Sequence, residues 1–237
     1  MAEANKMKMF AHAAVMSAFL LVFSGSARGA ETESAAAVPF PVASVHLEQN
    51  ATDGDMEVVF QVEGGHDGLA ELIVVSPDGR TVVAVRAPDS STLGIRQFRF
   101  ESPEPRDAKS LKAAYPEGVY EFSGKTSSGA KLVGKSTLSH RLPATTTFAK
   151  PAPAAANVSV KDLAISWSAV EGVASYVLSI KQSELNVSIT ALLPSSSTSF
   201  AVPHGFLLRG RKYKMAIGTV TREGNISYVE TTLTTER

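Results

Sequence analysis

Residues 163–180 read Leu-Ala-Ile-Ser-Trp-Ser-Ala-Val-Glu-Gly-Val-Ala-Ser-Tyr-Val-Leu-Ser-Ile, and this stretch decides the fold. Apolar side chains occupy every second position in two runs, one ending at Trp167 and the next beginning at Tyr176. A period of two is the pattern of a strand that buries one face. Gly172 lies between the runs, as expected for a loop. The stretch therefore predicts two short neighbouring strands with Trp167 and Tyr176 in a hydrophobic core.

The same alternation continues to the end of the chain. Phe200 and Val202 alternate before a turn at 203–205, and Tyr213 begins a third inward-facing row. The loop 222–225 then returns the chain to a last strand near 227–234. Seven short strands fit into residues 157–237, which predicts a β-sandwich.

Two motifs in this half carry a family resemblance. Residues 207–213, Leu-Leu-Arg-Gly-Arg-Lys-Tyr, are similar to the Leu-x-Pro-Gly-x-x-Tyr motif of fibronectin type III modules, with Arg209 in place of the proline. Ile-Ser-Trp at 165–167 resembles the strand that bears the buried tryptophan of that family. Residues 157–237 thus resemble a fibronectin type III domain, which implies that Trp167 and Tyr213 are buried and that the Tyr213 hydroxyl bonds to nearby backbone.

Residues 42–143 also predict an all-β domain. Residues 56–62 alternate in polarity, and Pro77-Asp78-Gly79 is a turn between two apolar runs. One helix is expected at 104–115, ended by Pro116. The segment 115–122, Tyr-Pro-Glu-Gly-Val-Tyr-Glu-Phe, resembles a module of uncharacterised exported bacterial proteins, a resemblance that implies no activity.

The ends of these blocks predict the domain organisation. Residues 1–30 have the basic start, short apolar run and small residues of a secretory signal, with cleavage after Ala27 or Ala30; a retained membrane helix is the alternative. Residues 31–41 are expected to form a flexible leader, and the Pro- and Ala-rich residues 144–156 a linker between the domains. We therefore expect a secreted or periplasmic protein with no stable membrane insertion after signal cleavage.

Charge and cysteine content exclude several classes of function. Cleavage after Ala30 leaves 20 basic and 22 acidic side chains, a net charge of −2. Such a balance argues against a nucleic-acid partner, which calls for a concentrated basic field. The chain has no cysteine, which excludes thiol catalysis, Cys-ligated metals and a lipid anchor on cysteine.

Candidate metal ligands are few. Asp53, Asp55 and Asp67 supply oxygens of the kind that calcium prefers, but Asp-Gly pairs also build ordinary turns. Both interpretations stay open, and we expect no metal site, no cofactor and no catalytic residue. No serine lies in a Gly-x-Ser-x-Gly elbow, and the histidines are scattered.

Binding surfaces are weakly indicated. Tyr228 and Phe206 are the aromatic residues left for a sugar platform, and the basic cluster 209–214 fits a solvated strand face better than an anion site. Four Asn-x-Ser/Thr sequons occur, at Asn50, Asn157, Asn186 and Asn225. The loops around Gly172, Gly205 and Gly224, or an edge strand, are the candidates for recognition.

These observations predict a non-enzymatic binding or scaffolding protein that contacts another protein of the envelope or exterior. A carbohydrate-binding or accessory module of an exported hydrolase system is the alternative. An enzyme with a site between the domains is a third hypothesis, which requires polar residues to converge in a cleft near the linker.

Overall fold

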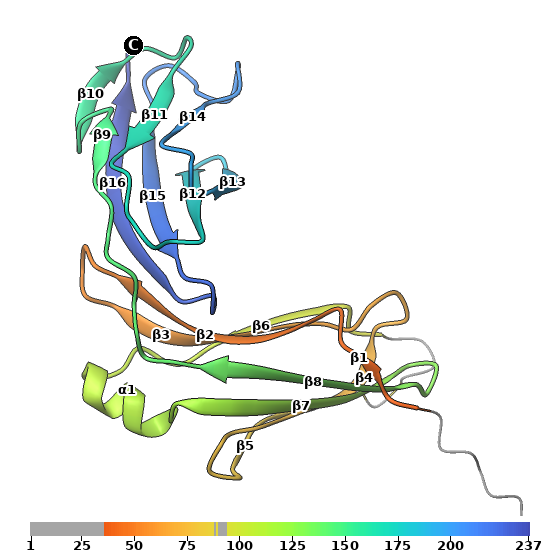
Figure 1. Cartoon of the computed structure of the whole chain (residues 1–237). Coiled ribbons are helices and arrows are strands. Elements are labelled where there is room, and N and C mark those ends of the chain that lie inside the picture. Colours follow the sequence, from red (N-terminus) through yellow and green to blue (C-terminus); the bar gives the residue numbers. More distant parts are fainter. Residues whose placement is uncertain (1–35, 88, 90–93) are drawn as a thin grey trace, which may run out of the picture. The chain divides into compact units, whose positions relative to one another are not determined.

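A computed structural model describes residues 36–87, 89 and 94–237 of the chain (Figure 1). Residues 35–237 form one compact unit. The expected signal sequence and its cleavage sites, as well as most of the expected leader, lie outside the described residues.

The N-terminal half is a sandwich of two sheets and one short helix. Its first sheet has the strand order β1-β8-β7-β4-β5, and its second has the order β2-β3-β6. Except for the parallel β1–β8 pair, neighbouring strands within these two sheets are antiparallel. The strands are β1 (Val38–Pro39), β2 (Val42–Asn50), β3 (Met56–Glu63), β4 (Leu69–Val75), β5 (Thr81–Arg86), β6 (Gln97–Glu101), β7 (Gly118–Thr126) and β8 (Lys131–Leu138).

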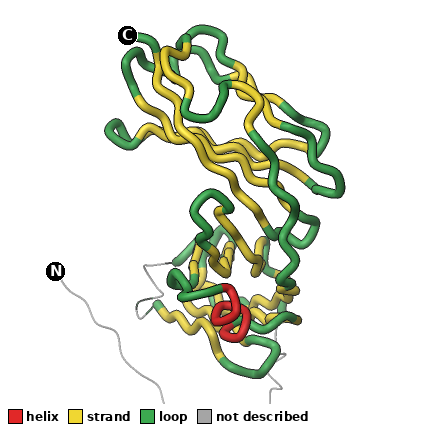
Figure 2. The backbone as a smooth tube through the Cα atoms, turned by 90° about the vertical axis from the view of Figure 1, so that its left-hand side faces the viewer, coloured by secondary structure: helices red, strands yellow, loops and turns green. Residues whose placement is uncertain are grey.

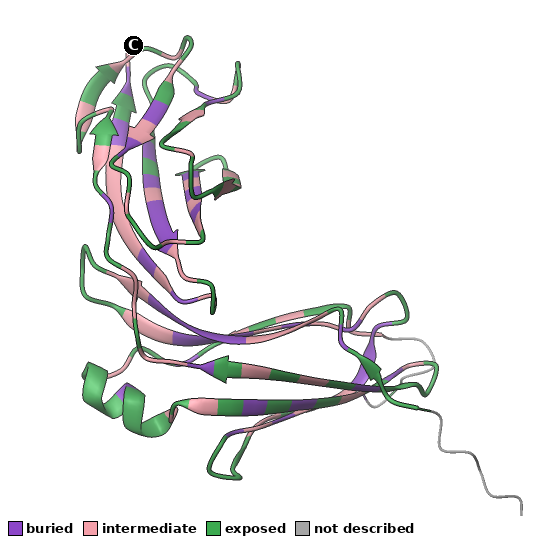
Figure 3. Cartoon of the chain, viewed as in Figure 1, coloured by how far each residue is buried: buried purple, intermediate pink, exposed green. Residues whose placement is uncertain are grey.

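Alternation along the strands builds the N-terminal core. Figure 3 shows buried and exposed bands following one another along β7, where Tyr120 and Phe122 are buried and Val119 and Glu121 are exposed. The inward-facing residues of both sheets join in one hydrophobic cluster. This is the arrangement expected for sheets packed face to face.

The single helix of the described part, α1 (Ala108–Ala114), is drawn in red in Figure 2. It begins later than residue 104, where we predicted it, because the Asp107 side chain caps it by accepting a hydrogen bond from the Ser110 N–H at 2.7 Å. Leu111 is its buried contact with the core. The predicted end before Pro116 is confirmed.

The C-terminal half is a second sandwich. A four-stranded sheet of order β13-β12-β15-β16 faces a three-stranded sheet of order β14-β11-β9, and β10 pairs with β16. The strands are β9 (Phe148–Lys150), β10 (Ala155–Val158), β11 (Ala164–Trp167), β12 (Ser175–Gln182), β13 (Val187–Pro194), β14 (Ser199–Ala201), β15 (Lys212–Val220) and β16 (Ile226–Thr235).

The two residues expected in its core are there. Trp167 is 3% exposed and Tyr213 is fully buried, and both belong to the second hydrophobic cluster. The Tyr213 hydroxyl accepts a hydrogen bond from the Leu208 N–H at 2.9 Å and donates to the Phe206 carbonyl at 3.3 Å. The predicted fold class, all-β with two tandem sandwiches and one short helix in the first, is confirmed for the described residues.

Two segments differ from the expected leader and linker. Strand β1 lies within residues 31–41, and Phe40 packs into the N-terminal core. Strand β9 and the start of β10 lie within residues 144–156 and pair with β11 and β16. Their prolines mask strand-like periodicity, but a proline is compatible with short edge strands, because the missing N–H can face away from the ladder.

Candidate functional site

The two sandwiches are joined by strand pairing. Strand β16 of the C-terminal sandwich pairs in parallel with β2 of the N-terminal sandwich, from Ile226 opposite Glu48 to Tyr228 opposite Asn50. One eight-stranded sheet, which also includes the off-path strand β10, therefore runs through both halves. The joint is therefore made by backbone hydrogen bonds between strands, as within any single sheet.

Asn225 secures this joint with its side chain. It is 1% exposed, and its Oδ1 accepts a hydrogen bond from the Leu47 N–H at 2.8 Å. Its Nδ2 donates to the Ser139 and Arg141 carbonyls, at 2.9 Å each, and contacts the Ser139 hydroxyl at 3.2 Å. One buried amide thus forms hydrogen bonds with backbone groups of two separate N-terminal segments. Without it these buried groups would lack partners, which costs free energy of folding.

Hydroxyl groups add to the joint next to Asn225. Ser227 Oγ donates to the Pro143 carbonyl at 2.8 Å, and Thr219 Oγ1 donates to the Ala144 carbonyl at 2.8 Å. Arg141 and Glu223 form an exposed ion pair at 3.9 Å beside them. The chain between the two sandwiches is therefore held against the second one by buried polar contacts.

A cleft of about 460 Å³ lies on the outer face of the joined sheet, where β2 meets β16. We call it the acidic groove, because five carboxylates and one lysine line it together with small and apolar side chains. Its charged residues are Glu48, Asp53, Asp55, Glu57, Glu230 and Lys214.

Residues with small side chains form the floor of the acidic groove. Val177, Ser179 and Ala216 line it, and all point away from the C-terminal core. A Cβ atom added at Gly218 would lie 2.7 Å from Cε1 of Tyr228, so the Tyr228 ring packs across this glycine. Burial and the nearby charge of Glu48 raise the pKa of Tyr228 well above its usual range.

Two glutamates on neighbouring strands of the acidic groove have opposite pKa shifts. Burial alone would raise the pKa of Glu48, but a 2.8 Å hydrogen bond from His46 and the charge of Arg99, 3.0 Å away, lower it below its ordinary value. Burial, together with the charges of Glu101 and Glu48, raises the pKa of Glu57 to about 7. Glu48 is therefore a compensated carboxylate, whereas Glu57 lies among like charges.

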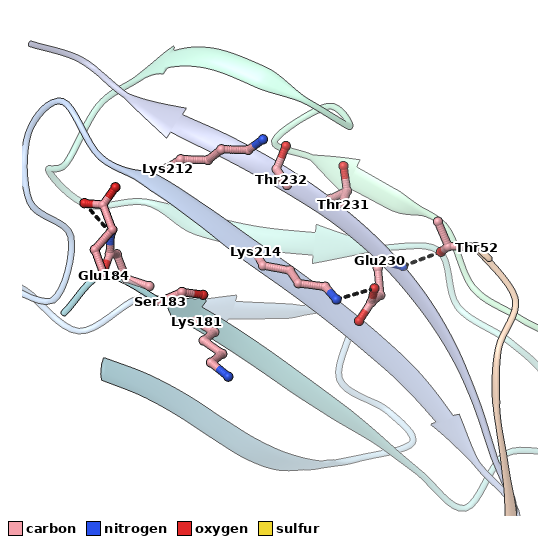
Figure 4. Close-up of a pocket in the computed structure, with 10 residues that line it drawn as sticks. Thr52, Lys181, Ser183, Glu184, Lys212, Lys214, Glu230, Thr231 and Thr232 are labelled. Carbon is pink, nitrogen blue, oxygen red and sulfur yellow. Dashed lines mark hydrogen bonds and ion pairs between the residues drawn. The ribbon is translucent and has the colours of Figure 1, made fainter. Parts of the chain in front are cut away.

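A second cleft, of about 440 Å³, continues from the first on the same face (Figure 4). We call it the lysine groove, since Lys181, Lys212 and Lys214 line it together with hydroxyl-bearing residues. Lys214 reaches Glu230 at 2.7 Å, and these two residues line both grooves. Glu184, which also lines the groove, forms an ion pair with Arg211 at 2.8 Å. The basic cluster expected at 209–214 is thus exposed as predicted, and two of its lysines line this groove.

The opposite edge of the four-stranded sheet is open. Within the described residues, β13 pairs with β12 alone. It carries no charged side chain, and Leu192 at its centre is 75% exposed. A long, uncharged edge strand offers a row of backbone donors and acceptors to another strand.

The three candidate calcium ligands do not converge on one point. Asp53 and Asp55 lie in the β2–β3 turn and accept hydrogen bonds from Asn50 Nδ2 and the Met56 N–H. Asp67 follows β3, whose eight residues span about 26 Å, and it accepts a hydrogen bond from Ser128. In the described part of the chain, no three His, Asp or Glu side chains are placed to hold a metal ion. The turn interpretation therefore fits these aspartates.

The aromatic candidates for a sugar platform are half-buried. Tyr228 packs across Gly218, and Phe206 packs on Tyr213 with ring centroids 6.0 Å apart. Among the candidate recognition loops, the one at Gly224 packs against another part of the chain, next to His46 and the buried Asn225. The Asn225 sequon is therefore covered.

A cleft near the linker does exist, as an enzyme between the domains would require. It measures about 360 Å³ and is lined by Arg141, Glu171, Arg222 and Glu223 among others. Among the described residues, no histidine shares a hydrogen bond with a serine or threonine hydroxyl: His46 bonds to Glu48, and His140 Nε2 bonds to the Tyr115 carbonyl. No helix of the described part is long and apolar enough to cross a membrane.

Sequence signals alone would not have found the joint or the grooves. Asn225 appears in the sequence only as a sequon, and the acidic groove brings Glu57 together with Glu230, which is 173 positions away. These contacts depend on the pairing of β16 with β2.

No protein-family model matches the chain, and no curated protein matches it. Among solved structures it is similar to the fibronectin(III)-like modules of Clostridium thermocellum CbhA, with 9% identity over 83% of this chain and 91% of that one and a TM-score of 0.33. It is also similar to a two-domain fibronectin type III segment of chicken tenascin, with 16% identity over 82% of this chain and 98% of that one and a TM-score of 0.32.

The chicken CNTN1 FN1-FN3 domains match with 13% identity, over 85% of this chain and 65% of that one, and with a TM-score of 0.32. At these TM-scores the likenesses carry no argument of their own, and the fold rests on the strand order of the chain itself. The resemblance of residues 42–143 to a module of exported bacterial proteins stays a prediction.

Proposed function

We propose that this chain is an exported, non-enzymatic binding or scaffolding protein that contacts another protein by strand addition at β13. The observation that carries the proposal is the free edge of β13, eight residues long and without charge. Main-chain hydrogen bonds to an added strand supply affinity at such an edge, and side-chain pockets supply specificity.

The other edges of the chain support this choice. Strand β1 has two residues and ends in Pro39, and β9 and β14 have three residues each. Strand β6 carries Arg99 and Glu101. Short length, proline and charge are the devices that protect an edge from pairing. The edge strand β5 ends in the charged Arg86. By these criteria β13 is left available up to Pro194 at its end.

The joint makes the rest of the molecule a suitable support. Paired strands and the buried Asn225 connect the two sandwiches, so β13 is held at one end of a sheet that continues into the N-terminal sandwich. A docking edge on a preorganised support loses less entropy on binding than a free segment does. This is the property that a scaffolding protein uses.

The test is partner capture with matched variants. Residues 31–237 would be used to capture proteins from envelope and culture-fluid extracts, with mass spectrometry as the readout. The double variant S188K/L192K places charges on β13, whereas L208K places one at an apolar residue that is 46% exposed and lies outside that strand.

We expect one partner to be captured by the wild-type protein and by L208K, and to be lost with S188K/L192K. Equal capture by both variants would show that β13 is not the contact. Recovery of polysaccharide in place of protein would instead support the accessory-module alternative.

A further inference from the structure

The two grooves form one surface with opposite charge at its two ends. Cross-strand neighbours share a face of a sheet, and the register places Ser179 opposite both Thr190 and Ala216, with Ala216 opposite Glu230. Lysines lie on one side of this row, on β12 and β15, Glu230 of β16 lies in the row, and the other carboxylates lie on β2, on β3 and in the turn between them. We call this surface the bipolar face.

Each half of the bipolar face contains a like-charge pair directly across neighbouring strands. Lys181 lies opposite Lys214, and Glu48 lies opposite Glu57. Like charges in directly opposed positions destabilise a sheet. Two such pairs on one face mean that its charge pattern is not arranged for the stability of the isolated chain.

One member of each pair is compensated within the chain and the other is not. Lys214 pairs with Glu230, and Glu48 pairs with His46 and Arg99. In the described part of the chain, the side chains of Lys181 and Glu57 form no hydrogen bond and no ion pair, although the charge of Arg99 acts on Glu57. The lysine half therefore contains an ammonium group, and the acidic half a carboxyl group, whose side chain has no hydrogen-bond or ion-pair partner in the described part of the chain.

We propose that two copies of this chain associate through the bipolar face, with the lysine half of each copy against the acidic half of the other. A twofold axis lying between the faces and passing over the Lys214–Glu230 pair brings both sets of opposite charges together. Such an interface is isologous, since every contact occurs twice.

Charge complementarity selects a second copy as the occupant. A partner of one sign would satisfy one half and be repelled by the other, whereas the same face turned by 180° matches both halves. The expected mature chain has a net charge of only −2, so long-range repulsion between copies is small.

The size of the face sets the expected strength. Five strands at about 4.8 Å and five residues at about 3.3 Å cover roughly 400 Å² per copy. That is about half of the roughly 800 Å² per partner in a standard interface, so the dimer belongs to the weak and transient class. Its attraction is between exposed charges and is therefore expected to fall with added salt.

The experiment is sedimentation velocity of residues 31–237, from about 10 to about 500 μM protein, at about 50 mM and about 500 mM salt. We expect a monomer–dimer equilibrium at low salt that shifts at least tenfold towards monomer at high salt. A monomer throughout the low-salt series overturns the proposal.

Two charge-reversed variants and their mixture supply the control. Because the mixture should recover the dimer, a loss of dimer in one variant cannot be explained by misfolding alone. K181E/K212E makes both halves acidic, and D53K/D55K/E57K makes both halves basic. Each variant alone should remain monomeric, and an equimolar mixture should recover the dimer because all contacts are again complementary. Dimerisation of either variant by itself, or a mixture that stays monomeric although both variants are folded, contradicts the proposed face.

This inference is separate from strand addition at β13. The charge-reversed variants keep β13 intact and should still capture its partner, while L192K alone tests β13 without placing a new cation opposite Lys181, as S188K does. Failure of one proposal thus leaves a different pattern from failure of the other.

Discussion

The two edges of the C-terminal four-stranded sheet differ in whether another strand pairs with them. At one edge, β16 pairs with β2, and Asn225, Ser227 and Thr219 hydrogen-bond to the segments that lead into the joint. At the other edge, β13 has no further strand beside it in the described part of the chain. Both edges present the same backbone groups, so the difference comes from what the rest of the chain supplies.

The comparison shows that buried polar side chains close an edge more specifically than apolar contact does. A strand can be added to any open edge, but the bonds of Asn225 to the Leu47 N–H and to two carbonyls hold in one register only. Apolar contacts tolerate a shift, whereas a buried amide in the wrong register is left unsatisfied. The closed edge therefore defines an arrangement, and the open one leaves room for a partner.

The largest expected effect comes from breaking the closed edge. Asn225→Ala removes the buried amide and leaves the Leu47 N–H and the two carbonyls without their partner. We expect a loss of about 3 kcal/mol in the free energy of unfolding, because each stranded buried group costs about 1–3 kcal/mol and water relieves part of this. Urea denaturation measures the loss.

The matched control is Arg141→Ala, which removes only the exposed ion pair with Glu223 at the same joint. It should change stability by less than about 0.5 kcal/mol. Equal effects of the two changes would mean that the joint is held by surface charge and that Asn225 has no special part in it.

A smaller effect is expected from a single hydroxyl. Thr219→Val keeps the shape of a fully buried side chain but removes its hydrogen bond to the Ala144 carbonyl. We expect a cost of about 1–2 kcal/mol from the unsatisfied carbonyl. Thermal unfolding of this variant beside Asn225→Ala would rank the contacts, and a cost above that of Asn225→Ala would reverse the order proposed here.

The acidic groove, next to the closed edge, predicts a dependence on pH. The pKa of Glu57 is raised from 4.5 to about 7, so the folded chain holds a proton there that the unfolded chain has lost. Its stabilising contribution is full below pH 4.5 and is lost as the pH rises from 4.5 to about 7. Besides burial, the charges of Glu101, Glu48 and Asp55 raise the pKa of Glu57, and the charge of Arg99 lowers it.

Glu57→Gln imitates the protonated side chain at every pH. The variant should match the wild type near pH 4 and exceed it above pH 7 by less than about 1 kcal/mol, because solvent screens a partly exposed group. Glu171→Gln, at an exposed position in a loop, should follow the wild type throughout. Urea midpoints across this range would contradict the prediction if the difference between Glu57→Gln and wild type did not grow with pH.

The smallest effect on stability is expected at the open edge. Leu192→Lys, made without the change at Ser188 that would face Lys181, alters one exposed side chain alone, so the free energy of unfolding should stay within about 0.5 kcal/mol. Light scattering during heating should show later aggregation, since charge protects an edge strand. Earlier aggregation than wild type would indicate that β13 is covered within the chain.

Local patterns were sufficient for most of the fold. Alternation at 163–180 predicted β11 and β12 with Trp167 and Tyr176 inside, and the resemblance of residues 207–213 to the fibronectin type III motif implied the hydrogen bond of the Tyr213 hydroxyl to nearby backbone. These patterns depend on near neighbours in the chain. The strands β1, β9 and β10 were not predicted within 31–41 and 144–156, because short proline-flanked strands carry too few residues to show a period.

The candidate surfaces could be predicted only in part. The sequence indicated that lysines 212 and 214 are exposed and that an edge strand is a candidate contact, but it named neither β13 nor the grooves. Lys181 and Lys214 become neighbours through the pairing of β12 with β15, and Glu57 meets Glu230 through the joint of β2 with β16. Such contacts require knowledge of which strands pair.

The sequence by itself determined two cores, their inward-facing residues and an all-β class, because strand periodicity is a local property. Tertiary structure alone decided that β16 joins β2, that Asn225 is buried and that opposite charges share one face. Hydrogen bonds between strands have nearly the same geometry for every sequence, so the choice of partner strand follows from how the whole chain packs.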